Sequence, residues 1–326
     1  MKPFLLLCTK IWRRKISRKQ FLKIVWMFIV GVIVSSFRLR TLFAQPAITT
    51  GRVKKKITGE YDLVEVRSSD AYGATIKAIE SIGGIGRFVK PGNTVVIKPN
   101  IAWDRTPEYA ANTNPQVVAA LVELCKDAGA KRINVFDITC NDSRRSYASS
   151  GIEKVAKERG ARVFIPDDWN MVNAHFEYNS PMEKWPILRD AVECDVFINV
   201  PVLKHHRLTG LTLSMKNLMG VCGGTRGRMH FDIGRKIVDL TDLIKPELTV
   251  IDATKVLVRN GPTGGDLNDV KVMDKVLVGT DPTLVDSYAS VLMGKDPLSI
   301  PYIKNAVERN IGSSLVDQAS ILKLAI

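Results

Sequence analysis

The sequence predicts an α/β fold in which a mainly parallel sheet is flanked by helices, either as one body or as two subdomains. From residue 61 onward, short apolar runs of strand length alternate with longer segments whose apolar residues recur at helical spacing. Glycine or proline stands at most of the boundaries between them. The chain has 326 residues, 45% hydrophobic and 25% charged, which is ordinary for a globular protein with a sizeable core.

The first half of the domain alternates between strands and helices that turn residues delimit. In chain order we expect strand 62–66, helix 71–82, strand 94–97, a helix from residue 115, strand 133–136, helix 152–159 and strand 162–165. Gly83, Gly129 and Gly160 follow the three helices, as glycine does where a chain leaves a helix in the left-handed region. Pro115 opens the second helix, because a proline at the first helical position loses no hydrogen bond.

The second half continues the alternation. Its expected elements are strand 196–200, helix 211–219, helix 233–244, strand 248–251, strand 275–278 and helix 282–292. The strand VFINV at 196–200 is almost wholly apolar, which is typical of a strand covered on both faces. Pro282 opens the last helix and Gly294 ends it.

Four segments make up the expected domain organisation. Residues 1–44 form a basic signal or anchor segment, 45–60 a linker, 61–315 the α/β domain and 316–326 a C-terminal tail. A subdomain break is a candidate at 168–190, where Pro181 and Pro186 interrupt the rhythm of strands and helices.

The first segment has the pattern of an export signal. Eight basic and no acidic residues lie in positions 1–23, before the apolar run IVWMFIVGVIVSSF at 24–37. That run is shorter than the roughly 20 residues of a bilayer span and suits the core of a signal peptide. Residues 17–23, SRKQFLK, resemble the twin-arginine motif S-R-R-x-F-L-K, with Lys19 in place of the second arginine.

We therefore expect the twin-arginine export machinery to be a partner and the body to lie in the periplasm or on the outer face of the cytoplasmic membrane. The cleavage site is poor, because Leu42-Phe43-Ala44 offers one small residue where two are needed. Two alternatives remain open. One is an uncleaved leader that contacts the membrane through residues 1–44, and the other is a cytoplasmic protein with a basic amphipathic start.

The net charge of +14 is confined to the beginning of the chain. Fourteen of the 47 Lys and Arg residues precede Glu60, the first acidic residue, so the 33 that follow equal the 33 Asp and Glu residues. A protein that binds nucleic acid needs a basic surface on its folded body to track phosphates. We therefore expect no nucleic-acid partner.

The five cysteines do not have the spacing of a metal or cluster motif. They stand at positions 8, 125, 140, 194 and 222, and none forms a C-x-x-C pair. We expect no iron–sulphur cluster, and the cofactor stays open. Cys125 and Cys194 lie in apolar segments and are expected in the core.

Candidate site residues follow the expected strands, because open α/β sheets bind ligands outside the carboxyl ends of strands. Lys98 and Asn100 flank Pro99 just after strand 94–97 and are candidate ligand-binding residues. Lys204 and His205 follow strand 196–200, and Lys216 lies in the mostly apolar stretch LTLSMKNLMG. Burial and like charge lower the pKa of a lysine toward neutrality, and a lysine held near a histidine can do acid–base work. Lys204, His205 and Lys216 are therefore the candidate catalytic residues.

Ligand binding is also expected from an amide and from glycines downstream. Asn217 follows Lys216, and Gly220, Gly223 and Gly224 allow backbone amides to approach an anion closely. The glycines match neither the P-loop nor the dinucleotide-binding pattern.

A metal site is a weaker expectation. The candidate ligands are His206, His230 and Asp232. His205 and His206 would face opposite ways on a strand, so both rarely ligate one ion.

Six segments together have a family resemblance: VVIKPN, NPQVVAALVELCKDAGAKRINVFD, DVFINVPVLKHH, SMKNLMG, NGPTGGD and VLVGTDPTLVDSYASVLMG. They resemble the family called domain of unknown function 362, and the likeness runs from about residue 61 to about residue 312. The resemblance implies a twin-arginine leader, which many members have and which agrees with residues 17–23. Many members also contain a four-cysteine ferredoxin-like module, but the five cysteines of this sequence do not have its pattern, so we do not expect the cluster here.

The run from Asp195 to Gly220 is similar in layout to nickel-pincer lactate racemases. Both have a strand, a basic residue near a histidine, and a lysine followed four residues later by glycine. In those enzymes the lysine holds the cofactor and histidines move the proton. The resemblance implies that Lys216 is a tether and that His205 or His206 is an acid–base group.

The function expected from these observations is an exported enzyme that uses lysine and histidine acid–base chemistry on a small anionic substrate. Two alternatives stay open: a non-catalytic envelope protein that binds an anionic ligand or assists a redox partner, and a racemase-like or epimerase-like enzyme with a lysine-tethered nickel cofactor.

Overall fold

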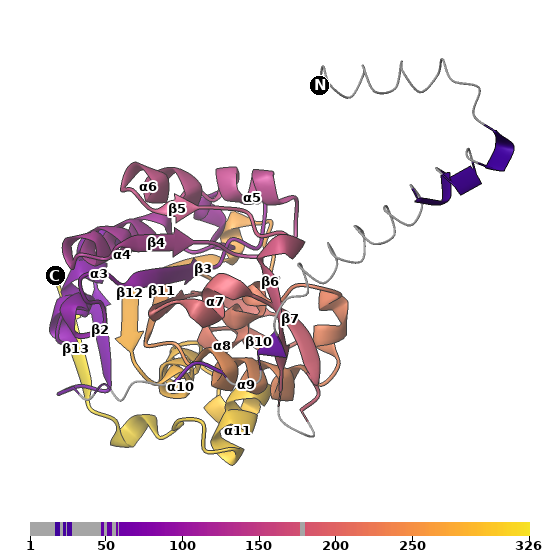
Figure 1. Cartoon of the computed structure of the whole chain (residues 1–326). Coiled ribbons are helices and arrows are strands. Elements are labelled where there is room, and N and C mark those ends of the chain that lie inside the picture. The colour runs from indigo at the N-terminus through magenta and orange to yellow at the C-terminus, as the bar shows by residue number, and fades with distance from the viewer. Residues whose placement is uncertain are drawn as a thin grey trace. The chain divides into compact units, whose positions relative to one another are not determined.

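A computed structural model of the chain (Figure 1) describes residues 17–19, 22–23, 25–27, 47–48, 51–53, 57, 59–176 and 180–326. The chain divides into two compact units, residues 1–46 and 47–326. In the first unit, Arg18 and Lys19 are helical and exposed, and most of the apolar run 24–37 lies outside the described residues. Within the part of the chain that is described, every helix is too short or too polar to span a bilayer.

The second unit is built on a ten-stranded sheet. Its main path runs in the order β13 (Ile321–Ala325), β2 (Leu63–Arg67), β12 (Val270–Gly279), β11 (Leu248–Leu257), β8 (Val196–Val200), β3 (Thr94–Pro99), β4 (Arg132–Val135) and β5 (Arg162–Val163). Beside this path, β9 (Val202–His206) pairs with β11, and β10 (Gly210–Thr212) pairs with β9.

Most neighbouring strands of this sheet are parallel, as the alternation of strands and helices predicted. The run from β11 through β8, β3 and β4 to β5 is parallel throughout. Strand β12 is antiparallel to both of its neighbours, β11 and β2. The carboxyl ends of β3, β8 and β4 therefore meet at one edge of the sheet, where an open α/β sheet binds ligands.

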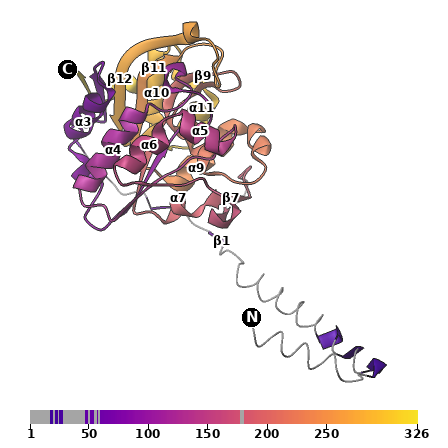
Figure 2. The same cartoon turned by 90° about the horizontal axis from the view of Figure 1, so that it is seen from above.

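Alternate residues of the strands enter two separate cores, one on each face of the sheet. In β8, Val196, Ile198 and Val200 pack with helices α3 (Ala71–Ser81), α4 (Pro115–Asp127) and α6 (Ile152–Glu158). Phe197 points to the other core, with α9 (Ile233–Ile244), α10 (Pro282–Leu292) and α11 (Pro301–Glu308). Figure 2 shows α3, α4 and α6 side by side over their face. The predicted α/β class with helices on both faces is confirmed.

Capping residues fix the ends of the helices next to the sheet edge. Asn114 accepts a hydrogen bond from the amide of Gln116 ahead of Pro115, which opens α4. Asp281 accepts from the amides of Thr283 and Leu284 and in the same way starts α10.

The segment 211–219, which we expected to be one helix, folds differently. It begins with β10, continues as the short helix α8 (Ser214–Asn217) and ends in a 3-10 turn at Leu218–Val221. The reason is tertiary: Leu211 and Thr212 pair with His205 and Lys204 of β9, a strand that the sequence did not predict. Strand pairing thus overrides the helical spacing of the apolar residues.

Two further segments complete the unit. In the region 168–190, β6 (Met171–His175) and β7 (Lys184–Leu188) form a hairpin that belongs to a small separate sheet with β1 (Ala47–Ile48). Residues 316–326, expected as a tail, instead include β13, which pairs in parallel with β2. The remaining helices are α5 (Ser143–Ser149) and α7 (Arg189–Glu193).

Candidate functional site

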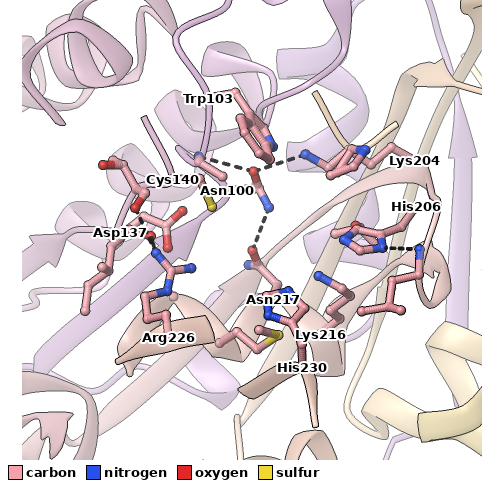
Figure 3. Close-up of a pocket in the computed structure, with 18 of the residues that line it drawn as sticks. Asn100, Trp103, Asp137, Cys140, Lys204, His206, Lys216, Asn217, Arg226 and His230 are labelled. Carbon is pink, nitrogen blue, oxygen red and sulfur yellow. Dashed lines mark hydrogen bonds between the residues drawn. The ribbon is translucent and has the colours of Figure 1, made fainter. Parts of the chain in front are cut away.

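A cavity of about 640 Å3 lies beyond the carboxyl ends of β3 and β4 and beside β9 and α8 (Figure 3). The predicted residues that line it are Lys98, Asn100, Lys204, His206, Lys216, Asn217, Gly220 and His230. They lie up to 132 positions apart in the sequence, and the shared sheet edge brings them together. Figure 3 shows the side chains of Asn100, Lys204, His206, Lys216, Asn217 and His230 converging from different elements on one space.

Lys98 forms the buried base of the cavity. Its Nζ lies 2.7 Å from Asp137 Oδ1 and donates to Asn217 Oδ1 at 2.9 Å and to the carbonyl of Pro99 at 2.8 Å. Burial lowers the pKa of Lys98, and Asp137 opposes that shift. Because two hydrogen bonds and the ion pair with Asp137 already engage the ammonium of Lys98, this residue holds the scaffold together rather than awaiting a ligand.

Asn217 connects three segments through its amide group. Its Nδ2 donates to the carbonyl of Lys98 at 3.1 Å and to Asn199 Oδ1 at 2.9 Å. Its Oδ1 accepts from Asn100 Nδ2 at 3.2 Å as well as from Lys98. The amides of Asn217 and Asn100 are thus engaged with the protein, and their hydrogen bonds fasten α8 to β3 and β8.

Lys204 lies on the central part of β9 and is almost completely buried. Its Nζ donates to the carbonyl of Ala111 and lies 3.5 Å from Asn100 Oδ1. Burial lowers the pKa of Lys204 to about 7, and the charge of Lys216 lowers it further. A large fraction of this amine is therefore neutral at physiological pH, and a neutral amine can accept a proton.

His206 lines the same cavity, and its surroundings keep its imidazole neutral. Its Nδ1 accepts from the amides of Leu208 at 3.2 Å and Thr209 at 3.3 Å. Burial, followed by the charges of Lys216 and Lys204, lowers the pKa of His206 to about 3. The imidazole is therefore neutral with its proton on Nε2, so His206 can donate a hydrogen bond to a ligand.

His205, the histidine we expected in the site, does not line the cavity. Successive residues of a strand face opposite ways, so His205 points away from the side that Lys204 and His206 share. Its Nδ1 accepts from the amide of Gly261 at 3.1 Å. The geometry therefore supports His206 rather than His205 as the histidine of the site.

Lys216 lies on α8 and lines the cavity without a partner. Its amine makes no hydrogen bond or ion pair with the described residues. Burial lowers the pKa of Lys216 to about 8, the nearby Cys140 thiol offsets part of that shift, and Arg226 and Lys98 add to it. Asp286 positions the helix, because its carboxylate accepts from the amides of Ser214 at 2.7 Å and Met215 at 3.0 Å.

Of the three predicted glycines, Gly220 alone lines the cavity. A Cβ atom at Gly220 would lie 1.8 Å from Asp137 Oδ1 and 2.6 Å from Lys98 Nζ, so the ion pair requires a glycine here. Gly223 and Gly224 instead contact the β7 region: the carbonyl of Gly223 accepts from Trp185 Nε1 at 3.0 Å, and Gly224 adjoins Pro186.

The candidate metal ligands are only partly brought together. His206 and His230 line the cavity, whereas Asp232 lies outside it and forms an ion pair with Arg235 at 3.2 Å. Among the described residues, no group of three or more His, Cys, Asp or Glu side chains is arranged to hold a metal ion. The metal site stays a prediction.

Among the cavity residues that sequence reasoning missed are Trp103, Asp137, Cys140 and Arg226. Asp137 follows the expected strand 133–136 directly, so the rule that identified Lys98 would also have found it. Arg226 lies among the glycines at 220–227 and donates to the carbonyls of Ile138 and Thr139, both at 2.8 Å. Trp103 and Cys140 stand in irregular loops, where no spacing rule applies.

The chain is similar to several known proteins. A thylakoid-associated protein from Synechocystis sp. is 28% identical over 241 residues, which cover 68% of this chain and 70% of that protein. The solved lactate racemase apoprotein from Thermoanaerobacterium thermosaccharolyticum has a TM-score of 0.41 at 13% identity, covering 72% of this chain and 59% of that one. A protein from Thermotoga maritima has a TM-score of 0.37 at 12% identity, covering 71% of this chain and 60% of that one.

This chain thus spans about three fifths of the length of those two solved chains. A family model matches residues 95–291, from β3 to α10. The matched segment includes Lys98, Lys204 and Lys216. That family is described as Domain of unknown function (DUF362), and the match spans more than half of the chain. The family predicted from the six sequence segments is confirmed: this chain is a member of the domain of unknown function 362 family.

Proposed function

We propose that this protein is an enzyme that binds an anionic substrate in the cavity and moves protons with lysine amines. The observation that carries the proposal is Lys216, a largely buried amine that lines the cavity and that no described residue pairs. Burying an unpaired charge is costly, so such a group is retained where a ligand completes it.

The charges of the cavity favour an anion. Among the described lining residues, Asp137 supplies the carboxylate, and Lys98 neutralises it. Lys216 and Arg226 then leave an excess of positive charge. An anion bound beside Lys216 would stabilise its ammonium form and so raise its pKa.

The lysines and the histidine take different roles in this proposal. Lys216 in its charged form binds the anionic group, and His206 donates from Nε2 to a substrate oxygen. Neutral Lys204 accepts a proton from the substrate, and the resulting ammonium is held by the carbonyl of Ala111 and by Asn100. The proton returns from Lys204 to the product, which completes a cycle of general acid–base catalysis.

Replacement of Lys216 by Met tests the anion site. We expect Lys216→Met to bind inorganic phosphate and acetate at least tenfold more weakly by calorimetry, a loss of about 1.4 kcal/mol. Lys154→Met removes an exposed lysine from α6 and serves as the control, with unchanged binding expected. Equal affinity in Lys216→Met and the unsubstituted chain would remove Lys216 from the site.

The titration of Lys204 separates catalysis from simple binding. NMR of the chain labelled with 13C at the lysine Cε atoms, with Lys204→Met for assignment, should find one amine that titrates near pH 7. A Lys204 amine that titrates above pH 10 would favour the alternative of a non-catalytic anion-binding protein. Intact-mass spectrometry tests the tethered-cofactor alternative, which requires an adduct that Lys216→Met loses.

We also propose that the twin-arginine machinery exports the body and that the protein associates with a membrane. Support comes from the motif at residues 17–23 and from the thylakoid-associated relative. Arg18 and Lys19 are exposed, as a recognition motif must be. Joint replacement of Arg18 and Lys19 by Gln should leave the body in the cytoplasm in cell fractionation, and unchanged export of that variant would contradict the proposal.

A further inference from the structure

The cavity is larger than a small anion needs. Its volume of about 640 Å3 lies within the roughly 300–1,000 Å3 of pockets that enclose drug-sized ligands. A water molecule takes about 30 Å3 of liquid volume, so a group the size of acetate would leave most of this space empty.

The lysines of the cavity and most of its apolar lining residues come from different parts of the fold. Lys98, Lys204 and Lys216 belong to strands β3 and β9 and to helix α8. The apolar lining residues stand mainly in the loops that follow the strands, two to five positions farther along the chain: Ala102, Trp103, Ile138, Leu208 and Pro262. The cavity thus has the lysines at its floor, and the apolar side chains form a wall that also includes Arg207, Arg226 and His230. Figure 3 shows Trp103 on the wall opposite Asn217.

Hydrogen bonds hold these walls in place before any ligand arrives. Arg226 fixes the loop of Ile138 through two carbonyls at 2.8 Å. Asn112 accepts from the amide of Trp103 at 3.1 Å and donates to its carbonyl at 2.7 Å. The amide of Leu208 donates to His206. A preformed apolar wall lowers the entropic cost of binding an apolar group.

We propose that the ligand of this cavity is an amphipathic organic anion, with its charged head at Lys216 and an apolar body of several carbon atoms against Trp103, Ile138 and Leu208. The position of the head rests on the proposed function, whereas the apolar body is new and follows from the volume and the walls. Apolar groups leave water for such a wall with a free-energy gain proportional to the area buried.

A series of straight-chain carboxylates tests the inference on the full chain. Acetate, butanoate, hexanoate and octanoate share one head and differ only in apolar length, and 1-hexanol supplies a body without a charge. We expect the Kd measured by calorimetry to fall at least twofold per added methylene from butanoate to octanoate, since complete burial gives nearly fourfold. Hexanoate should bind at least tenfold more tightly than 1-hexanol.

Two leucines provide a variant of the cavity wall and its matched control. Leu208 is 55% exposed at the cavity, and Leu298 is 47% exposed and does not line it, so Ser at either position leaves the core intact. Leu208→Ser should weaken octanoate at least threefold and leave acetate unchanged, whereas Leu298→Ser should change neither. Equal losses in the two variants, or octanoate that fails to bind, would overturn the inference.

The outcomes distinguish this inference from the proposed function. Carboxylates that all bind equally, and all weaken in Lys216→Met, would overturn the apolar body and leave the anion site standing. Binding of 1-hexanol as tight as that of hexanoate, with no effect of Lys216→Met, would overturn the anion site and with it the amphipathic ligand.

Discussion

The contact between Gly220 and the buried ion pair makes Gly220→Ala an informative substitution. The added methyl would lie 1.8 Å from Asp137 Oδ1 and 2.6 Å from both Cε and Nζ of Lys98. The backbone cannot easily move away, because the carbonyl of Gly220 accepts from the amide of Ile138 at 3.0 Å. The ion pair must therefore separate.

The cost of separation follows from burial. Both side chains of the pair are almost completely inaccessible, at 1% for Lys98 and 2% for Asp137. Breaking a buried ion pair typically costs 3–5 kcal/mol, because each charge loses its compensation without regaining water, so we expect Gly220→Ala to lose about 3 kcal/mol. For a domain of this size that loss corresponds to a drop in Tm of roughly 5 °C.

Urea unfolding followed by circular dichroism measures the effect, and Gly227→Ala is the control. Gly227 lines the same cavity, but its added methyl would meet no atom within 4 Å, so its free energy of unfolding should change by less than about 0.5 kcal/mol. A Gly220→Ala protein with the midpoint of the unsubstituted chain would refute the argument from the ion pair.

Three further expectations concern pH, a thiol and a carboxylate. Burial lowers the pKa of Lys204 to about 7 and of Lys216 to about 8. Because the unfolded chain then binds more protons, the free energy of unfolding should rise between pH 7 and pH 10, and less steeply in Lys216→Met; a flat profile would contradict this. In a Cys8→Ser chain, iodoacetamide should label exposed Cys140 first by peptide mapping, since burial raises the pKa of the three other described cysteines to about 12. Asp286→Ala leaves the two buried amides of Ser214 and Met215 without an acceptor and should lower the free energy of unfolding in urea by about 2–3 kcal/mol. Asp70→Ala removes an exposed cap and should cost less; equal losses would exclude Asp286 as the residue that positions α8.

Much of the sheet could be predicted from local pattern. The strand 196–200 and the helices 233–244 and 282–292 have the predicted bounds, because apolar runs and the proline and glycine signals agree there. The strands β9 and β10 could not be predicted from local pattern, since they form by pairing with each other and with β11, which is distant in the sequence. That pairing also explains why 211–219 is not a helix.

In the candidate site, too, some residues could be predicted from local pattern and others depend on tertiary pairing. The position of Lys98 and Lys204 beyond strand ends follows from a general property of parallel sheets. The choice between His205 and His206 depends on which face of β9 meets the cavity. The pairing of β9 with β11 shifts register between Asp252 and Leu257, and such an irregularity leaves no local trace in the sequence.

The hydrogen bonds of Asn217 limit which side chains evolution can place beside the key lysine. The position demands two donors, toward the carbonyl of Lys98 and toward Asn199, and one oxygen that accepts from Lys98 and Asn100. Aspartate has the length but lacks the donors, and glutamine has the donors but adds a methylene to a closed space. Substitutions meant to alter ligand preference can therefore be placed in the loops around the cavity, whereas Asp or Gln at position 217 would disrupt the hydrogen bonds that hold α8 beside Lys216.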